Sequence, residues 1–190
     1  EYQGKIFQLP MPNSEGKAIR IAHKPTDIPI YLATLGPNSL EYTGEVANGW
    51  MGTSFSPDHP EAHFDFLKRG AEKANRSLED LNLCVSTRIE IGDDVEAMIE
   101  KRKPAVAFNM GGMGSRTTNF YNDAFKRAGY EEDAIAIQSL WLAGEREQAA
   151  GRVPDAMVTE FQALGTREMI AARLKAYQEA GVTTLKLGLD

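Results

Sequence analysis

The feature that most constrains the fold is a repeated passage from a short apolar strand pattern into a helical pattern. Ile28-Pro-Ile-Tyr-Leu-Ala-Thr-Leu35 is a β-rich run that precedes apolar positions at helical spacing. Trp50-Met-Gly-Thr-Ser-Phe55 likewise precedes the amphipathic pattern of residues 60–75. Leu83–Ile91 alternates and then meets Asp93-Asp94, which is placed to cap another helix. Such alternation predicts a parallel sheet covered by helices.

Local signals predict where two helices begin. Asn38-Ser-Leu-Glu41 has the Asn-x-x-Glu form of a capping box, so we expect a helix to begin there. Thr166 is placed to cap a helix that ends at Gly181, and Val182–Leu187 follows as a last strand.

Residues 103–165 interrupt the alternation, and we interpret them as a helical insertion. The glycine-rich stretch Gly111–Arg116 predicts a loop, and the apolar spacing after it predicts short helices that stop at Gly129, Gly144 and Gly165. The chain then divides into an irregular initial stretch over 1–27, βα units over 28–102, the insertion over 103–165, and a last helix and strand over 166–190.

Composition excludes several kinds of partner. The 21 Lys and Arg against 27 Asp and Glu give a net charge of -6 without a basic run, so we expect no nucleic-acid partner. No apolar stretch approaches the about 20 residues that cross a bilayer, and no secretory signal is visible, which predicts a cytoplasmic protein without a membrane partner. The single cysteine, Cys84, lies in an apolar run and is predicted to be a small buried hydrophobe rather than a nucleophile.

Periodicity leaves two architectures open. Four parallel strands with their helices form either a small open α/β domain or half of an eight-stranded barrel, and both have the same alternation.

Four passages carry more specific motifs: Tyr2–Leu9, Ile28–Pro37 running on to Gly44–Thr53, Gly165–Met169 and Ala180–Leu185. Together they resemble the C-terminal half of the bacterial luciferase-like superfamily, and within it the oxidoreductases that use the deazaflavin coenzyme F420. The second passage is the most specific, because it is similar to the Ala-Ala-x-Gly-Pro strand end and the Ala-Asp-Gly-(Trp/Phe) strand start of F420-dependent reductases. One departure is Asn48, where Asp is usual.

The resemblance implies an α/β fold, the C-terminal half of a (β/α)8 TIM barrel covering about strands 5 to 8, as a single partial domain. It implies an oxidoreductase that transfers a hydride between F420 and a small organic substrate, as in the methylenetetrahydromethanopterin reductase class. An FMN-dependent monooxygenase is the alternative within the superfamily, and a non-catalytic half-barrel module for ligand binding or assembly is the alternative from another class. In the family the N-terminal half supplies the acid or base, so we assign no catalytic residue and expect no turnover from this chain alone.

The turn between the first strand and its helix is the main candidate for coenzyme binding. A helix N-terminus presents free N–H groups and the positive end of the helix dipole, and Gly36 lets an anion approach closely. An ordinary βα turn is the structural alternative. With the resemblance, we predict that the coenzyme is bound by Ala33, Thr34, Leu35, Gly36, Pro37, Asn38 and Thr53.

Other motifs receive a weaker interpretation. Ser115 and Arg116 end the glycine-rich loop and are the candidates for substrate binding, since such a loop forms an anion-binding nest. His59 and His63 have the spacing of helical metal ligands, but Pro60 places His59 outside the helix, so we predict no metal site. Trp50 and Trp141 are interpreted as core residues.

The outer strands of a half-barrel carry unpaired edges. Ile28–Thr34 and Val182–Leu187 would each lack a neighbour, and an apolar strand with open backbone groups is a template for pairing. We therefore expect these edges to pair with a second copy, as a homodimer, or with a missing N-terminal half.

Overall fold

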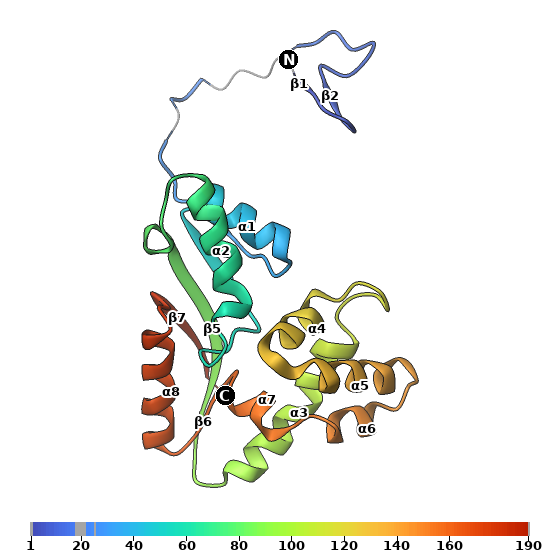
Figure 1. Cartoon of the computed structure of the whole chain (residues 1–190), viewed down its shortest axis with the longest axis vertical. Coiled ribbons are helices and arrows are strands. Elements are labelled where there is room, and N and C mark those ends of the chain that lie inside the picture. Colours follow the sequence, from blue (N-terminus) through green and yellow to red (C-terminus); the bar gives the residue numbers. More distant parts are fainter. Residues whose placement is uncertain (1, 18–21, 25, 190) are drawn as a thin grey trace.

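The computed structural model describes residues 2–17, 22–24 and 26–189 (Figure 1). Its strands are Tyr2–Gln3 (β1), Gln8–Leu9 (β2), Tyr31–Leu32 (β3), Gly49–Gly52 (β4), Asn82–Ile91 (β5), Ala163–Gly165 (β6) and Thr184–Leu189 (β7). Its helices are Pro37–Val46 (α1), Glu61–Lys73 (α2), Leu78–Asp80 (η1), Val95–Gly111 (α3), Phe120–Phe125 (α4), Lys126–Tyr130 (η2), Glu131–Leu142 (α5), Arg146–Gly151 (α6), Asp155–Thr159 (α7) and Arg167–Glu179 (α8).

The main sheet is parallel and is built around β5, its longest strand. Val85 of β5 pairs with Gly52 of β4 and with Leu185 of β7, so these two strands lie on opposite edges of β5. Ile89 pairs with β7 and with Ala163 of β6, which places β6 on the same side as β4. The order β3-β4-β5-β6, with β7 beside β5, confirms the predicted parallel α/β fold.

Helices α1, α2 and α8 cover one face of this sheet. Leu40 of α1, Leu67 of α2 and Tyr177 of α8 share one buried cluster with Trp50, Phe55, Leu83 and Val85. Helices α1 and α2 cross closely, because a Cβ at Gly70 would lie only 1.7 Å from the carbonyl oxygen of Glu41. A side chain at this position would separate the two helices.

The insertion forms a second buried cluster beside the sheet (Figure 1). Its core brings together residues from α3, α5, α6 and α7, among them Met110, Ile137, Ala149 and Met157. Asn122 is buried there and donates to the carbonyl oxygens of Met110 and Ala134, at 3.1 and 2.8 Å. These bonds join α4 to α3 and α5, so the predicted helices pack as one unit.

Two predicted helix termini are confirmed and one is wrong. The side chain of Asp94 accepts from the N–H of Ala97, and that of Thr166 accepts from the N–H of Met169. The capping box at Asn38 is not formed, because Gly36 is the N-cap residue and Pro37 opens α1. The Glu41 side chain instead pairs with Lys73 and Arg69 of α2.

Several predicted boundaries also need correction. The helix expected over Met157–Leu164 is the short helix α7 followed by strand β6, because Ala163–Gly165 pairs with the end of β5. Helix α3 continues past residue 103, so the insertion grows out of this helix. The initial stretch contains the antiparallel hairpin β1–β2.

The first strand and the cysteine also differ from expectation. The strand expected over residues 28–35 is reduced to β3, which in the described part of the chain pairs with β4 alone. Cys84 is half-buried, because it lies on the face of β5 that is turned away from Leu83 and Val85. No helix in the described ranges is both long and apolar enough to span a membrane.

Candidate functional site

A cavity of about 640 Å³ lies where β3 and β4 end. The carboxyl ends of parallel strands are where α/β proteins bind ligands, because loops and helix N-termini meet there. One wall comes from the turn after β3, and the opposite wall comes from the insertion. The lining residues are Ala33, Thr34, Leu35, Gly36, Ser39, Met51, Thr53, Met113, Gly114, Thr118, Phe120 and Tyr121.

The turn after β3 is held by bonds from two other parts of the fold. The indole Nε1 of Trp50 donates to the carbonyl oxygen of Thr34 at 2.9 Å. Arg127, from the insertion, donates through Nη2 to the carbonyl oxygen of Leu35 and through Nε to that of Ala62, both at 2.9 Å. The turn is therefore a rigid wall of the cavity.

Gly36 closes the cavity at the N-terminus of α1. A Cβ at this position would lie 3.1 Å from the ring of Phe120, so a larger residue would push the two walls apart. The N–H groups of Asn38 and Ser39 have no carbonyl one turn earlier in the helix, and Leu40 is the first to bond back, to Gly36 at 2.9 Å. These free donors suit an anion or a carbonyl oxygen.

The lining of the cavity is apolar, except for one polar end at the N-terminus of α1. None of the described residues that line it carries a charge, and Met51, Met113 and Phe120 supply broad apolar surface. A flat ring system fits between such walls, and a phosphate group fits at the N-terminus of α1. The residues present therefore fit a deazaflavin or flavin coenzyme.

The structure gathers most of the predicted coenzyme residues. Ala33, Thr34, Leu35, Gly36 and Thr53 line the one cavity, whereas Pro37 and Asn38 lie next to it in the first turn of α1. Their role in binding the coenzyme stays a prediction.

The two predicted substrate residues lie outside the first cavity. Ser115 accepts from the N–H of Thr118 at 3.0 Å and so closes the loop. Arg116 borders a separate surface hollow with Gln138 and Ser139.

Sequence reasoning missed the contribution of Thr118, Phe120 and Tyr121 to the cavity. The available signal was Asn119, whose side chain caps α4 by accepting from the N–H of Tyr121 at 3.1 Å. This cap orients the start of α4 toward the turn after β3.

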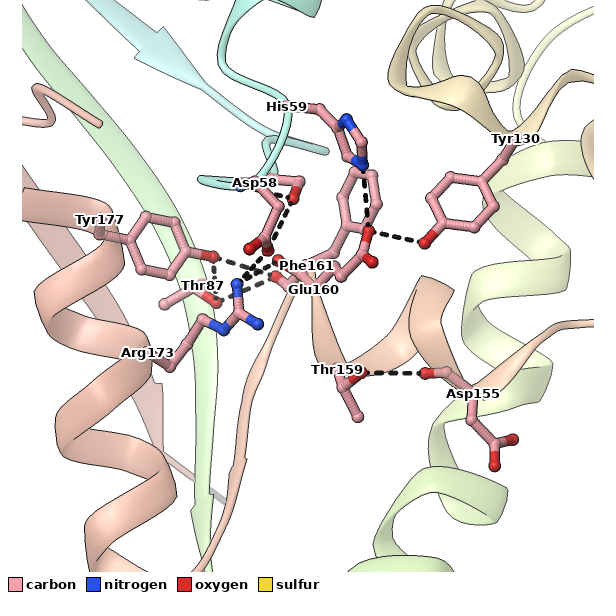
Figure 2. Close-up of polar contacts among 11 residues, drawn as sticks. Asp58, His59, Thr87, Tyr130, Asp155, Thr159, Glu160, Phe161, Arg173 and Tyr177 are labelled. Atoms are coloured by element: carbon pink, nitrogen blue, oxygen red, sulfur yellow. Dashed lines mark hydrogen bonds and ion pairs between the residues drawn. The ribbon is translucent and has the colours of Figure 1, made fainter. Parts of the chain in front are cut away.

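A polar network joins three parts of the chain (Figure 2). Asp58, in the loop after β4, forms an ion pair with Arg173 of α8. Glu160 accepts from the hydroxyl of Tyr130 at 2.6 Å and lies 3.4 Å from Nε2 of His59. Burial, and then the bond to Glu160, raise the pKa of Tyr130, so its hydroxyl stays protonated and donates. The network ties the insertion to the sheet.

His63 is enclosed by aromatic rings and takes no part in this network. Its ring centroid lies 5.3 Å from that of Trp50 and 5.8 Å from that of Phe55, and neither ring nitrogen has a hydrogen-bond partner in the described structure. Burial lowers the pKa of His63 to about 3. His59 faces Glu61 and Glu160 instead, so the two histidines do not converge.

Comparison with known proteins identifies the family. The family model for luciferase-like monooxygenases matches residues 1–184. A Mycobacterium tuberculosis protein named as a coenzyme F420-dependent oxidoreductase is 30% identical over 96% of this chain and 55% of its own. The 5,10-methylenetetrahydromethanopterin reductase of Methanopyrus kandleri is 28% identical over 99% of this chain and 51% of its own. The chain therefore spans about half the length of these relatives.

Solved structures support the same relationship. The F420-dependent tetrahydromethanopterin reductase from Methanopyrus kandleri superposes with a TM-score of 0.67 at 28% identity, covering 100% of this chain and 52% of that one. An F420-dependent secondary alcohol dehydrogenase, with a TM-score of 0.60 at 15% identity over 86% of this chain and 44% of that one, shares the fold. The chain belongs to the luciferase-like monooxygenase family and is similar, within it, to F420-dependent oxidoreductases.

Proposed function

We propose that this chain is the coenzyme-binding half of an F420-dependent oxidoreductase. The observation that carries the proposal is the cavity at the ends of β3 and β4, which gathers five predicted coenzyme residues at a helix N-terminus. The relatives named as F420-dependent support this choice of coenzyme. When bound, the deazaflavin supplies the hydride chemistry, between its ring and a small organic substrate.

The residues of this chain bind and orient the coenzyme. The free N–H groups of Asn38 and Ser39 would hold its phosphate, while Met51 and Phe120, which line the cavity, would bind its ring and exclude water. The backbone around Thr34 is held by the bonds from Trp50 and Arg127, so the site is formed before the coenzyme arrives. No catalytic acid or base is assigned to this half.

The proposal includes a half-barrel architecture. Ile28 and Ile30, in the segment that leads into β3, are 71% and 60% exposed, and Leu187 of β7 is 41% exposed. Large apolar side chains on open strands indicate a surface that another part of an assembly covers. The relatives are about twice as long, which fits a barrel closed by strands outside this sequence.

Replacing Gly36 by Val tests the coenzyme site. The new side chain meets the ring of Phe120 and blocks the approach to the N-terminus of α1, so we expect F420 affinity to fall by about tenfold or more. Gly151→Val is the matched control, because nothing lies within 4 Å of a Cβ there. F420 fluorescence titration measures both. Equal affinity in the two variants, or a wild-type preference for FMN, contradicts the proposal.

A further inference from the structure

A second cavity, of about 530 Å³, adjoins the first. The two cavities share Thr53, at the end of β4. The second one is bounded by the paired strands β5 and β7 on one side and by helix α3 on the other. Thr53 therefore borders a ligand in either cavity.

Ser86 and Lys186, in the strand wall of this cavity, lie on the sheet face that α1, α2 and α8 leave uncovered. Side chains alternate along β5, so Val85 and Thr87 are buried among the helices while Ser86 is exposed on the other face. Ser86 is the register partner of Lys186 in β7, and both line the cavity. Adjacent parallel strands are about 4.8 Å apart, so the hydroxyl of Ser86 and the ammonium group of Lys186 are close enough to donate to one ligand.

Basic side chains line this cavity, although the chain as a whole is acidic. The chain has a net charge of -6, yet the described residues that line the cavity include Arg88, Arg102 and Lys186 and no carboxylate. Arg102 is bound to Glu90 at 2.6 Å. Lys186 makes no ion pair or hydrogen bond with any residue in the described ranges.

The helix wall is mostly apolar. Val106 and Phe108 of α3 face the cavity, and Phe125 and Phe161 extend the same surface. A ligand lying against this wall displaces water from the Lys186 ammonium group, and a negative charge on the ligand compensates this loss better than a neutral acceptor does. The cavity is suited to a molecule with an apolar body and an anionic end.

We propose that the second cavity binds the substrate, and that this substrate is an organic anion carrying a carboxylate or a phosphate. Lys186 and Ser86 donate to its anionic end, and its apolar body lies against Val106 and Phe108. This inference rests on the proposed function, because it takes the first cavity to be the coenzyme site.

Binding of small aromatic probes tests the charge preference. Benzoate and phenyl phosphate should bind the wild-type protein more tightly than benzamide, as measured by isothermal titration calorimetry. Lys186→Met should weaken both anions by about tenfold or more, since hydrogen bonds to charged groups are the strong ones. Lys175→Met, at an exposed lysine of α8 that pairs with Glu179, is the matched control. Equal binding of benzoate and benzamide, or no effect of Lys186→Met, overturns the proposal.

A titration with F420 separates substrate from coenzyme. Lys186→Met should leave F420 affinity unchanged, and phenyl phosphate should still bind when the protein is saturated with F420. Displacement of phenyl phosphate by F420, or weakened F420 binding in Lys186→Met, would show that the cavity holds the coenzyme's own anionic part and would overturn the substrate assignment. Failure of the wild type to bind F420 contradicts the proposed function instead. The binding of benzoate and phenyl phosphate is measured without F420, so that result still tests the charge preference of the second cavity.

Discussion

At the residue scale, single side chains in this fold are placed by contacts that join distant segments. Arg127 binds the carbonyl oxygens of Leu35 and Ala62 at once, so one guanidinium connects the insertion, the turn after β3 and the start of α2. Tyr177 likewise donates to Thr87 at 3.1 Å and to the carbonyl oxygen of Phe161 at 3.2 Å. Such bonds make the cavity walls depend on the packing of the whole chain.

Because His63 is buried and uncharged in the folded chain, we expect the protein to be less stable in mild acid. Its pKa is about 3 in the folded chain and about 6.5 when unfolded, so only the unfolded state binds a proton as the pH falls through 6.5. Lowering the pH from 7 to 5 should then cost about 2 kcal/mol through this residue. Urea unfolding at both pH values measures it.

A variant isolates the contribution of His63. His63→Leu keeps the apolar packing against Trp50 and should remove this part of the pH dependence, whereas His23→Gln, at an exposed position, should retain it. The same pH dependence in His63→Leu and in the wild type would show that other groups cause it.

At the scale of elements, the closest packing is the crossing of α1 and α2. Besides Gly70, a Cβ at Gly44 would lie 1.9 Å from the carbonyl oxygen of Leu67. Because the N-terminus of α1 borders the first cavity, a shift of this helix pair also moves the turn after β3. Packing of the two helices and shape of the site are therefore linked.

Gly70→Ala tests this crossing. The added methyl group overlaps the backbone of α1, so we expect the free energy of unfolding to fall by about 1–3 kcal/mol. Gly151→Ala, where the added methyl group meets nothing, should be neutral or stabilising by up to about 1 kcal/mol. Urea unfolding measures the free energy of unfolding of both variants. Equal values would mean that α1 and α2 can move apart at little cost in stability.

At the scale of the whole molecule, the open strands β3 and β7 predict self-association of the chain in isolation. At tens of micromolar, light scattering should give a mass above that of a single 190-residue chain. Ile30→Lys should reduce this mass, because a charge next to the open strand β3 opposes pairing. Ile135→Lys, at an exposed position of α5, is the control. A wild-type chain that stays monomeric argues against the half-barrel and for a small open domain.

Local sequence patterns by themselves determined the alternation of strands and helices, the caps at Asp94 and Thr166, and the turn from β3 into α1 over 33–36. Each of these depends on residues a few positions apart, whose propensities and hydrogen bonds act within one turn of chain. Tertiary structure decided β6, because its three residues become a strand only by pairing with a strand end more than 70 positions earlier. It also decided the second cavity, since the register of β5 and β7 brings Ser86 beside Lys186 across 100 residues of sequence, and no local pattern specifies that pairing.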